Sequence, residues 1–552
     1  MKKRMKASDA IVEVMKRENV SHVFCVPGES YLPLMDSIYE AKTIKMISAR
    51  HEGGAAFMAE AYGKATRKPG IAMATRGVGG SNLAIGIHTA FQDSTPMVVL
   101  LGQVHSKFRG REGFQEVDLD QFFGHIAKWT VEIKDAERVP EFIQRAFRVA
   151  QTGRPGPVVV SLPEDVLVEE ATMNFGPPIQ IPAPRPSAKE VVNVAELLGE
   201  AERPLILAGG GVIASHGEQL LVELAEKYQI PVMASFRRHD VFPNDNKLYA
   251  GHAGLGTFPA ILETMKHADF ILAIGTRLSE VTTQDYRIFN HNPKLVHIDI
   301  SYETLGKVYS PDIGIVADAK EALEVLLEMQ VNKRWNGWAA ERRIAYEQSL
   351  KVKANENGKW VDNQRIIQTL QERLPVDAII TNDAGNFAGW LHRFYSFRKP
   401  KTYIGPTSGA MGYGLPAAIG AKIANPDKTV VSLSGDGGFM MTVQELETAV
   451  RYNIPVISLV FNNSSYGTIR MHQEMHYPER VIGTELNDVD FAKLSESLGA
   501  KGFKVKSNED FEKALNEALE TNKPAVIEIL TNPEQLSVAE TVQSIREKSS
   551  AK

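Results

Sequence analysis

The chain has 552 residues, and its 62 Lys and Arg against 67 Asp and Glu leave a formal net charge of −5, which does not indicate nucleic acid as a partner. The single cysteine, Cys25, excludes intrachain disulfides, cysteine-rich zinc sites and iron–sulfur clusters, and it favours a cytoplasmic location. No apolar run approaches the roughly 18 residues that span a bilayer, so no membrane partner is expected. The length suits three or four domains, and a metal would need histidine or oxygen ligands.

Short apolar strands alternate with helical stretches in the first third of the chain. The predicted strands are Val23–Val26, Lys45–Ser48, Ile71–Thr75 and Pro96–Gly102, with a helix over about Gly54–Gly63 between the second and the third. Such alternation is typical of strand–helix–strand crossovers, which build a parallel sheet covered by helices. We therefore predict a doubly wound α/β domain over residues 1–173.

Proline recurs through residues 174–188, which predicts an extended linker. Two further blocks with the same alternation follow, a central domain over 189–330 and a third domain over 361–552. Their predicted strands are Pro204–Ala208, Pro231–Ser235, Phe270–Ile274 and Leu295–Ile300, and then Ala378–Thr381, Thr429–Leu433, Pro455–Phe461 and Ala525–Leu530. A charged helical stretch is predicted from about Lys320 to Lys353, and residues 331–360 are interpreted as a helical connector. The predicted fold class is α/β, with three doubly wound parallel-sheet domains.

A glycine-rich turn and an asparagine pair follow two successive strands of the third domain. If these strands are parallel neighbours, Asp436 and Asn463 both lie at their carboxyl ends, where open α/β sheets bind ligands. Gly435, Gly437 and Gly438 would let a phosphate approach the backbone. A carboxylate and an amide oxygen suit Mg²⁺ that bridges a diphosphate. Gly-Asp-Gly alone is equally compatible with a tight turn between a strand and a helix.

The spacing between the two motifs favours the ligand interpretation. Gly-Asp-Gly followed after some two dozen residues by Asn-Asn is similar to the cofactor motif of thiamine-diphosphate enzymes. Further stretches, in family order and over nearly the whole chain, resemble the acetolactate (acetohydroxyacid) synthase large-subunit family. They are Ala49–Ala65, Leu101–Val104, Glu112–Asp118, Gly153–Val166, Val296–Ser301 and Ala410–Ala421.

This resemblance implies a pyrimidine-binding first domain, a nucleotide-binding-like central domain and a third domain that binds the diphosphate. It also implies active sites between the first domain of one subunit and the third domain of another, and hence a homodimer or homotetramer. The cofactors would be thiamine diphosphate and Mg²⁺, and the substrate a small 2-oxo acid.

The resemblance assigns roles to individual residues. Glu52 matches the acid that hydrogen-bonds the cofactor aminopyrimidine and so promotes loss of the thiazolium C2 proton. Met411 would lie beneath the cofactor, although without the resemblance it is most simply a core residue. The remaining residues expected at the cofactor are Thr75, Asn82, Gly385, Asn386, Phe387, Gly435, Asp436, Gly437, Gly438, Asn463, Ser465, Tyr466, Gly467 and Thr468. The Mg²⁺ ligands would be the side chains of Asp436 and Asn463 and the carbonyl of Ser465.

On the substrate side, the resemblance suggests Gln115 as a catalytic residue. Lys128 is a second candidate there, but a solvated surface lysine explains it equally well.

The implied reaction is that of an acetolactate synthase-like carboligase, in which pyruvate loses CO₂ and its two-carbon unit is joined to a second 2-oxo acid. Three departures from the family pattern keep other activities open, and one of them is the altered flavin stretch described below. Residues 76–82, Arg-Gly-Val-Gly-Gly-Ser-Asn, replace Gly-Pro-Gly-Ala-Thr-Asn, and residues 470–473 replace a stretch with a tryptophan that shapes the acceptor pocket. The alternatives are a 2-oxo acid decarboxylase, a lyase with another donor or acceptor, and a non-catalytic binding protein that kept the fold.

Two further patterns suggest other ligands. Residues 209–214 fit a dinucleotide-binding glycine turn, but no acidic residue closes the next strand, so a plain glycine-rich turn is the better interpretation. The family can hold FAD in the central domain, yet its Arg-Phe-Asp-Asp-Arg stretch is Arg-Leu-Ser-Glu-Val at 277–281 here, which disfavours flavin. His472 and His476 flank Glu474 with the wrong spacing for a zinc helix.

Overall fold

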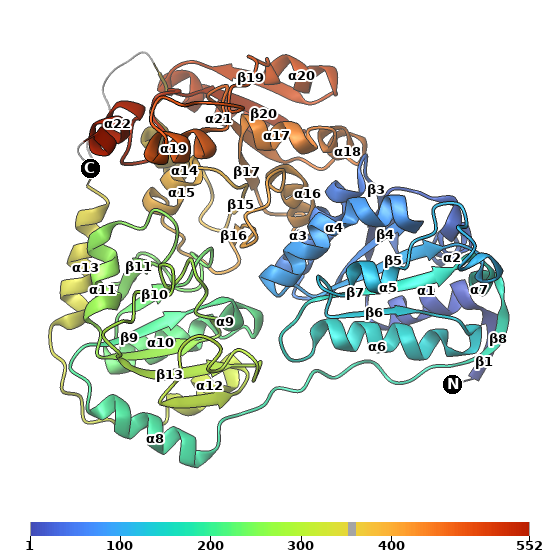
Figure 1. The fold of residues 1–552 in the computed structure, drawn as a ribbon, viewed down its shortest axis with the longest axis horizontal. Helices are drawn as coiled ribbons and strands as arrows, with labels where there is room; N and C mark the ends of the chain where they lie inside the picture. The colour runs from blue at the N-terminus through green and yellow to red at the C-terminus, as the bar shows by residue number, and fades with distance from the viewer. Residues whose placement is uncertain (1, 352–359, 551–552) are drawn as a thin grey trace.

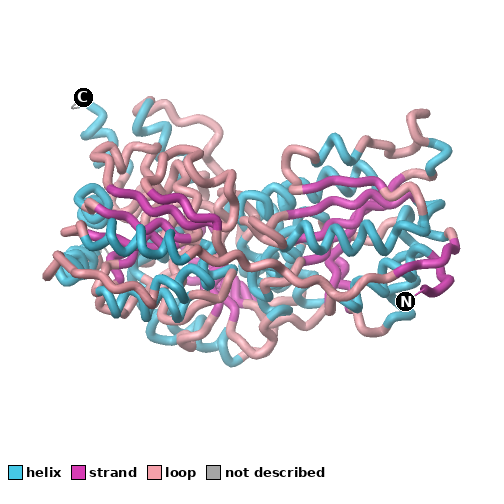
Figure 2. Tube along the Cα trace, turned by 90° about the horizontal axis from the view of Figure 1, so that it is seen from below, coloured by secondary structure: helices cyan, strands magenta, loops and turns pink. Residues whose placement is uncertain are grey.

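The computed structural model describes residues 2–351 and 360–550, and three six-stranded parallel sheets organise them (Figure 1). In Figure 1 the first domain is blue to cyan, the central domain green, and the third domain orange to red. Helices lie on the faces of the sheets (Figure 2), which leaves the apolar strands buried. The predicted fold class, three doubly wound parallel-sheet domains, is confirmed.

The first domain contains the most N-terminal sheet. Across this sheet the strands are β3 (Lys45–Ser48), β2 (His22–Cys25), β4 (Gly70–Thr75), β5 (Met97–Gln103), β7 (Pro157–Pro163) and β6 (Trp129–Glu132). The helices are α1 (Ala7–Arg17), α2 (Leu32–Ala41), α3 (Glu52–Thr66), α4 (Arg76–Asp93), α5 (Leu119–Phe123), α6 (Val139–Gln151) and α7 (Glu164–Val168). A separate antiparallel pair, β1 (Lys2–Lys6) with β8 (Glu170–Asn174), joins the beginning of the domain to its end.

Residues 175–187 form no helix or strand and lead to the central domain. Its strands, in sheet order, are β11 (Tyr249–His252), β10 (Val232–Ala234), β9 (Pro204–Ala208), β12 (Phe270–Ile274), β13 (Lys294–Asp299) and β14 (Ile313–Val316). Its helices are α8 (Ala188–Gly199), α9 (Gly210–Ala214), α10 (Glu218–Tyr228), α11 (Pro259–His267) and α12 (Ala319–Leu326), and α13 (Trp338–Ser349) packs against it.

The continuous helical stretch predicted from about Lys320 is wrong in its middle, because α12 ends at Leu326 and α13 begins at Trp338. The chain between them buries Trp335, whose indole N–H donates to the carbonyl of Tyr228 over 3.0 Å. Gly337 then starts α13 with a φ of +77°. The far end of the predicted stretch, at Lys353, lies outside the described residues.

The third domain carries the last sheet. Its strands, in sheet order, are β16 (Tyr403–Ile404), β15 (Ile379–Asn382), β17 (Val430–Gly435), β18 (Ile457–Asn462), β20 (Ala525–Leu530) and β19 (Lys501–Val505). The helices are α14 (Asn363–Arg373), α15 (Ala388–Phe394), α16 (Gly414–Ala424), α17 (Asp436–Thr442), α18 (Glu445–Arg451), α19 (Gly467–His476), α20 (Phe491–Ser497), α21 (Asn508–Glu520) and α22 (Val542–Ser550).

The first and third domains share one hydrophobic core, formed where α3 packs against α16 (Figure 1). At Gly420 of α16 a Cβ atom would lie 2.2 Å from the carbonyl oxygen of Met58 in α3, so the close approach of these helices requires glycine. Within the described ranges, no helix is long and apolar enough to cross a bilayer.

Candidate active site

The two motifs of the third domain meet at one edge of its sheet. Strands β17 and β18 are parallel neighbours, so Asp436, which opens α17, and Asn463, which follows β18, lie at adjacent carboxyl ends. The backbone N–H of Ser465 is 3.2 Å from the Oδ2 atom of Asp436 and 3.2 Å from the Oδ1 atom of Asn463. Both oxygens therefore face the same turn, as a cation shared between them would require.

The carboxylate of Asp436 is buried, so a nearby cation would stabilise its charged form. Desolvation raises the pKa of Asp436 to about 6, although the N–H groups of Gly437 and Ser465 oppose this shift. No cluster of three or more His, Cys, Asp or Glu side chains suited to a metal occurs in the described part of the chain. A cation bound at Asp436 and Asn463 would therefore take its remaining ligands from carbonyl, water or phosphate oxygens, as Mg²⁺ does.

The glycines of the turn bring protein groups close together. A Cβ atom at Gly437 would lie 2.5 Å from the ring of Tyr466, and one at Gly438 would lie 2.8 Å from Oδ2 of Asp383. At Gly435 the nearest neighbour would be the ring of Phe387 at 3.4 Å. The turn therefore needs glycine for its own packing, a reason that the sequence interpretation did not include.

The segment after β15 completes this edge of the sheet. Gly385 has a φ of +154° and a Cβ atom there would lie 2.6 Å from the ring of Phe387, so this position favours glycine. The backbone N–H of Asn386 donates to Oγ1 of Thr468 over 3.2 Å. The side-chain amide of Asn386 donates to the carbonyl of Leu536 over 2.6 Å. Three turns expected at a diphosphate, those after β15, β17 and β18, are thus brought together, and Gly467 begins α19 beside them.

Sequence reasoning missed Asp383, which holds the turn that contains Met411. Its carboxylate is fully buried and accepts the N–H of Ala384 at 2.7 Å and the N–H of Gly412 at 3.1 Å. Burial raises the pKa of Asp383 to about 6. The hydroxyl of Tyr413 donates to Glu60 of α3 over 2.5 Å, which ties the Met411 turn to the first domain. Only the position of Asp383 directly after a strand indicated it in the sequence.

Glu52 begins α3 at the carboxyl edge of the first sheet. His51 caps this helix, because its Nδ1 atom accepts the N–H of Gly53 at 2.9 Å. The side-chain amide of Asn82 in α4 donates to Oε2 of Glu52 over 2.9 Å, so the structure brings these two predicted residues together. Thr75 lies at the end of β4, where its hydroxyl is 2.7 Å from that of Ser30.

Glu445 is a second residue that sequence reasoning missed. It begins α18 in the third domain, is fully buried, and its carboxylate accepts the N–H groups of Arg50 and His51 in the first domain at 3.0–3.3 Å. Desolvation raises the pKa of Glu445 to about 7. No local signal marks it, because its partners are almost 400 residues away in the sequence.

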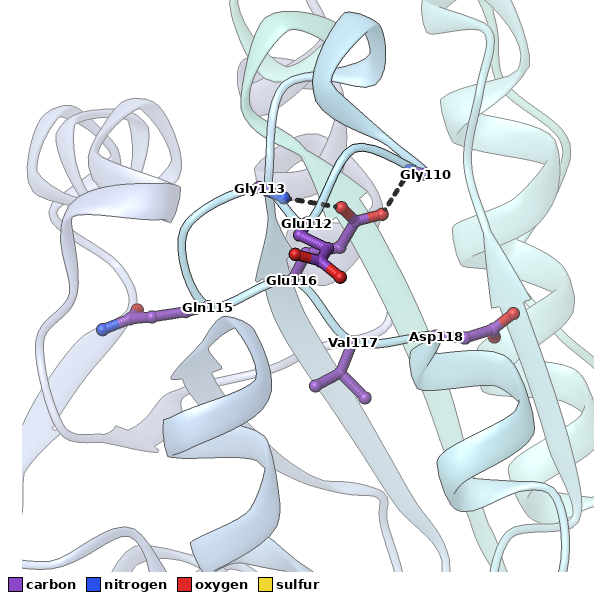
Figure 3. A pocket seen from close by; sticks show the side chains of 7 residues that line it. All are labelled: Gly110, Glu112, Gly113, Gln115, Glu116, Val117 and Asp118. Carbon is purple, nitrogen blue, oxygen red and sulfur yellow. Dashed lines mark hydrogen bonds between the residues drawn. The ribbon is translucent and has the colours of Figure 1, made fainter.

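Gln115 lies on a loop beside an open depression of about 430 Å³ (Figure 3). The loop is organised by Glu116, whose carboxylate accepts the N–H of Gly110 at 2.7 Å and the N–H of Gly113 at 2.9 Å. Gln115 itself has a φ of +63°, and in Figure 3 its side chain points away from Glu116. Gln115 and Glu52 are therefore placed at the same edge of the first sheet by different loops.

Lys128 has a local structural role. Its ammonium group donates to the carbonyl of Val149 over 2.6 Å and to that of Thr152, at the carboxyl end of α6. Burial lowers the pKa of Lys128 to about 8. A lysine that caps the last carbonyls of a helix is neither a solvated surface residue nor a free substrate ligand.

The central glycine turn packs against protein atoms. A Cβ atom at Gly209 would lie 2.3 Å from the carbonyl oxygen of Gly275, and one at Gly210 would lie 2.7 Å from Nε of Arg238. The close approach that these glycines permit is therefore to neighbouring backbone and side chains. Arg277, in the altered flavin stretch, donates to the carbonyl of Gln92 in the first domain over 2.6 Å.

The arrangement of α19 also argues against a zinc site. His472 and His476 are exposed, whereas Glu474 between them is buried and forms an ion pair of 2.6 Å with Arg546 in α22. The acid therefore points away from the histidines.

The comparison with known protein families agrees with this geometry. Successive parts of the chain match the N-terminal TPP binding domain (residues 5–122), the central domain (191–326) and the C-terminal TPP binding domain (383–529) of thiamine pyrophosphate enzymes. The fold and the matched domains thus define an enzyme of the thiamine pyrophosphate-dependent class.

Similar proteins extend the match over almost the full length. The chain is 36% identical to a probable acetolactate synthase large subunit from Methanocaldococcus jannaschii, over 96% of this chain and 92% of that protein. It is 33% identical to the acetolactate synthase isozyme 3 large subunit of Escherichia coli K12, over 94% and 92%. It is 32% identical to the chloroplastic acetolactate synthase 3 of Brassica napus, over 95% and 83%. The chain belongs to the acetolactate synthase large-subunit family.

Proposed function

We propose that this chain is a carboligase that uses thiamine diphosphate and Mg²⁺, decarboxylates pyruvate, and transfers the two-carbon unit to a second 2-oxo acid. The observation that carries the proposal is the near full-length similarity to proteins named acetolactate synthase large subunit. The pairing of Glu52 with Asn82, and of Asp436 with Asn463, supports it with the required chemical groups.

Thiamine diphosphate, when bound, supplies a nucleophilic carbon and a ring that accepts the electrons released by decarboxylation. In the proposal, the side chains of Asp436 and Asn463 and the carbonyl of Ser465 hold Mg²⁺. The diphosphate is lined by the glycines 435, 437 and 438, by Gly385, Asn386 and Phe387, and by Tyr466, Gly467 and Thr468, while Met411 supports the cofactor rings.

Glu52 is the proposed acid at the aminopyrimidine, with Thr75 and Asn82 beside it. Asn82 donates a hydrogen bond to Glu52, which fixes the orientation of the carboxyl group. The other carboxyl oxygen would remain available to hold the proton shared with the cofactor. Gln115 is proposed to face the substrate.

We further propose that two copies of the chain form each active site, within a homodimer or homotetramer. Exposed apolar side chains flank both halves of the site. On α4 Val78 and Ile85 are about half exposed next to Asn82, and on α17 Met440 and Met441 are about half exposed next to Asp436. Neighbouring apolar side chains that face solvent are typical of surfaces covered by a partner.

The location and flavin content follow from other observations. A cytoplasmic location is proposed from the single cysteine. The altered stretch at residues 277–281 and the protein atoms packed against Gly209 and Gly210 support a proposed enzyme that works without FAD.

A 2-oxo acid decarboxylase, or a lyase with another donor or acceptor, is the second candidate. The altered turn at residues 76–82 is the observation that favours it, since the N–H of Gly77 in this turn donates to the carbonyl of Gln115. A screen of 2-oxo acids with the purified chain, thiamine diphosphate and Mg²⁺, followed by identification of the products, separates the two. Joined products support the carboligase, whereas aldehydes and CO₂ alone support the decarboxylase.

A further inference from the structure

Arg76 occupies an unusual position at the start of α4. Its φ is +41°, a backbone conformation that residues other than glycine rarely adopt. Arg76 is nevertheless buried, with 7% of its surface exposed. A long charged side chain kept inside the protein at such a position indicates contacts that offset the strain.

The guanidinium of Arg76 joins three separate segments. Its Nη1 atom lies 3.2 Å from Oε1 of Glu29 and 3.5 Å from the carbonyl oxygen of Phe114, and its Nη2 atom lies 3.0 Å from Oε2 of Glu164. The guanidinium carbon is also 5.9 Å from the centre of the Phe114 ring.

The sheet topology explains how one side chain reaches all three segments. Strands β2, β4, β5 and β7 are adjacent and parallel, so the loops that follow them lie at one edge. Glu29 follows β2, Arg76 follows β4, Phe114 lies in the loop after β5, and Glu164 follows β7. Arg76 thus connects the loops of four neighbouring strands.

The turn at Arg76 also contacts the loop of Gln115 directly. The N–H of Gly77 donates to the carbonyl of Gln115 over 3.2 Å, and a Cβ atom at Gly77 would lie 2.4 Å from Cγ2 of Val117. Further along the same helix, Asn82 binds Glu52. The turn therefore links the loop of Gln115 to the residue that orients Glu52.

The charges around Arg76 indicate that its role is structural and that it does not bind an anion. Two carboxylates, Glu29 and Glu164, already flank the single guanidinium. An anionic substrate would therefore meet a net negative cluster at this point.

We propose that Arg76 is a positioning residue that fixes the Phe114–Gln115 loop beside Glu52 and so controls whether the two-carbon unit is joined to a second 2-oxo acid or released as an aldehyde. This inference rests on the proposed function and deepens it. In release, a proton replaces the acceptor carbon on the two-carbon unit, so a loop held in place at the acceptor side would favour joining by excluding water.

The test compares Arg76→Gly, which removes the side chain and suits the positive φ, with Arg76→Lys, which keeps the charge. The control is Arg138→Ala, because Arg138 also forms an ion pair, with Glu141, but is exposed. The first readout is amide hydrogen exchange over residues 109–118 of the chain without cofactor. We expect exchange about tenfold faster in Arg76→Gly, less in Arg76→Lys, and unchanged in the control.

The second readout is the ratio of aldehyde to joined product with pyruvate, thiamine diphosphate and Mg²⁺. We expect this ratio to rise about fivefold or more in Arg76→Gly, with partial recovery in Arg76→Lys and an unchanged thermal shift by the cofactor. Unchanged exchange, or an unchanged ratio in a variant whose loop exchanges faster, would overturn the inference. A wild-type chain without turnover would overturn the proposed function instead, and the exchange result would still decide whether Arg76 holds the loop.

Discussion

The carboxylate of Glu445 in the third domain accepts the backbone N–H of His51 in the first domain, with Oε1 and the amide nitrogen 3.0 Å apart. The N–H of Arg50 and the hydroxyl of Thr448 complete its partners. Since His51 directly precedes Glu52, the turn that places the proposed catalytic acid depends on a residue from another domain.

Replacing Glu445 therefore affects stability and activity together. In Glu445→Ala two backbone donors lose their acceptor inside the protein, so we expect the apparent free energy of unfolding to fall by about 2–5 kcal/mol in denaturant titrations. Turnover should fall as well, because the start of α3 is no longer fixed. The control is Glu447→Ala on the same helix, where a partly exposed ion pair with Arg451 is worth about 0.5 kcal/mol or less. Equal stability of the two variants would contradict this role of Glu445.

Glu52→Gln separates cofactor binding from activation. The glutamine keeps the hydrogen bond from Asn82 and the packing of α3, so thiamine diphosphate with Mg²⁺ should still raise the melting temperature. The variant loses the acid at the aminopyrimidine, so we expect kcat to fall by about 10²–10⁴-fold in steady-state assays. Full activity in Glu52→Gln would show that Glu52 has another role.

The burial of Asp436 predicts a pH dependence of metal binding. Its pKa is raised to about 6, and Mg²⁺ binds only the deprotonated form, so protons compete with the metal below this value. The affinity for Mg²⁺ in the presence of thiamine diphosphate should fall about tenfold per pH unit below pH 6 and stay constant above it, as measured by calorimetry. Asp436→Asn should abolish this dependence. The pKa of Asp383 is also raised to about 6, so Asp383→Asn is the control, and this variant should retain the pH dependence of Mg²⁺ binding.

Much of the fold follows from the sequence because its strands are short apolar runs between turn residues. The prediction for Phe270–Ile274 agrees with β12 at both ends, and the alternation in all three domains correctly predicts parallel sheets. The helical prediction after Lys320 fails around Trp335, where burial of a tryptophan indole against the central domain decides the path of the chain. Periodicity carries no information about such a contact.

The residues of the candidate site also differ in how far the sequence predicts them. Asp436 and Asn463 are recognisable from residue type and spacing, and they meet as expected because β17 and β18 are neighbours. Glu52 could be identified as a site residue only through the family resemblance, since an acid after a strand is usually solvated. Glu445 carries no signal in the sequence and Asp383 only its place after a strand, because the N–H groups of His51 and Gly412 that they accept come from other segments.

A mixing experiment tests whether each active site uses two copies of the chain. Glu52→Gln and Asp436→Ala are each inactive, but a mixed dimer would contain one site with both Glu52 and Asp436 intact. After the two variants are unfolded and refolded together, we expect about one quarter of wild-type activity, because half of the dimers are mixed and each has one working site. Activity no higher than that of either variant alone would indicate a site formed within one chain.

The identity of the product formed from pyruvate tests the central claim most directly. Purified chain is incubated with ¹³C-labelled pyruvate, thiamine diphosphate and Mg²⁺, and the products are followed by NMR spectroscopy. The proposed function predicts acetolactate as the main product, with one CO₂ released for every two pyruvate molecules consumed. Acetaldehyde and CO₂ without acetolactate, or no consumption of pyruvate by chain that has bound the cofactor, would contradict it.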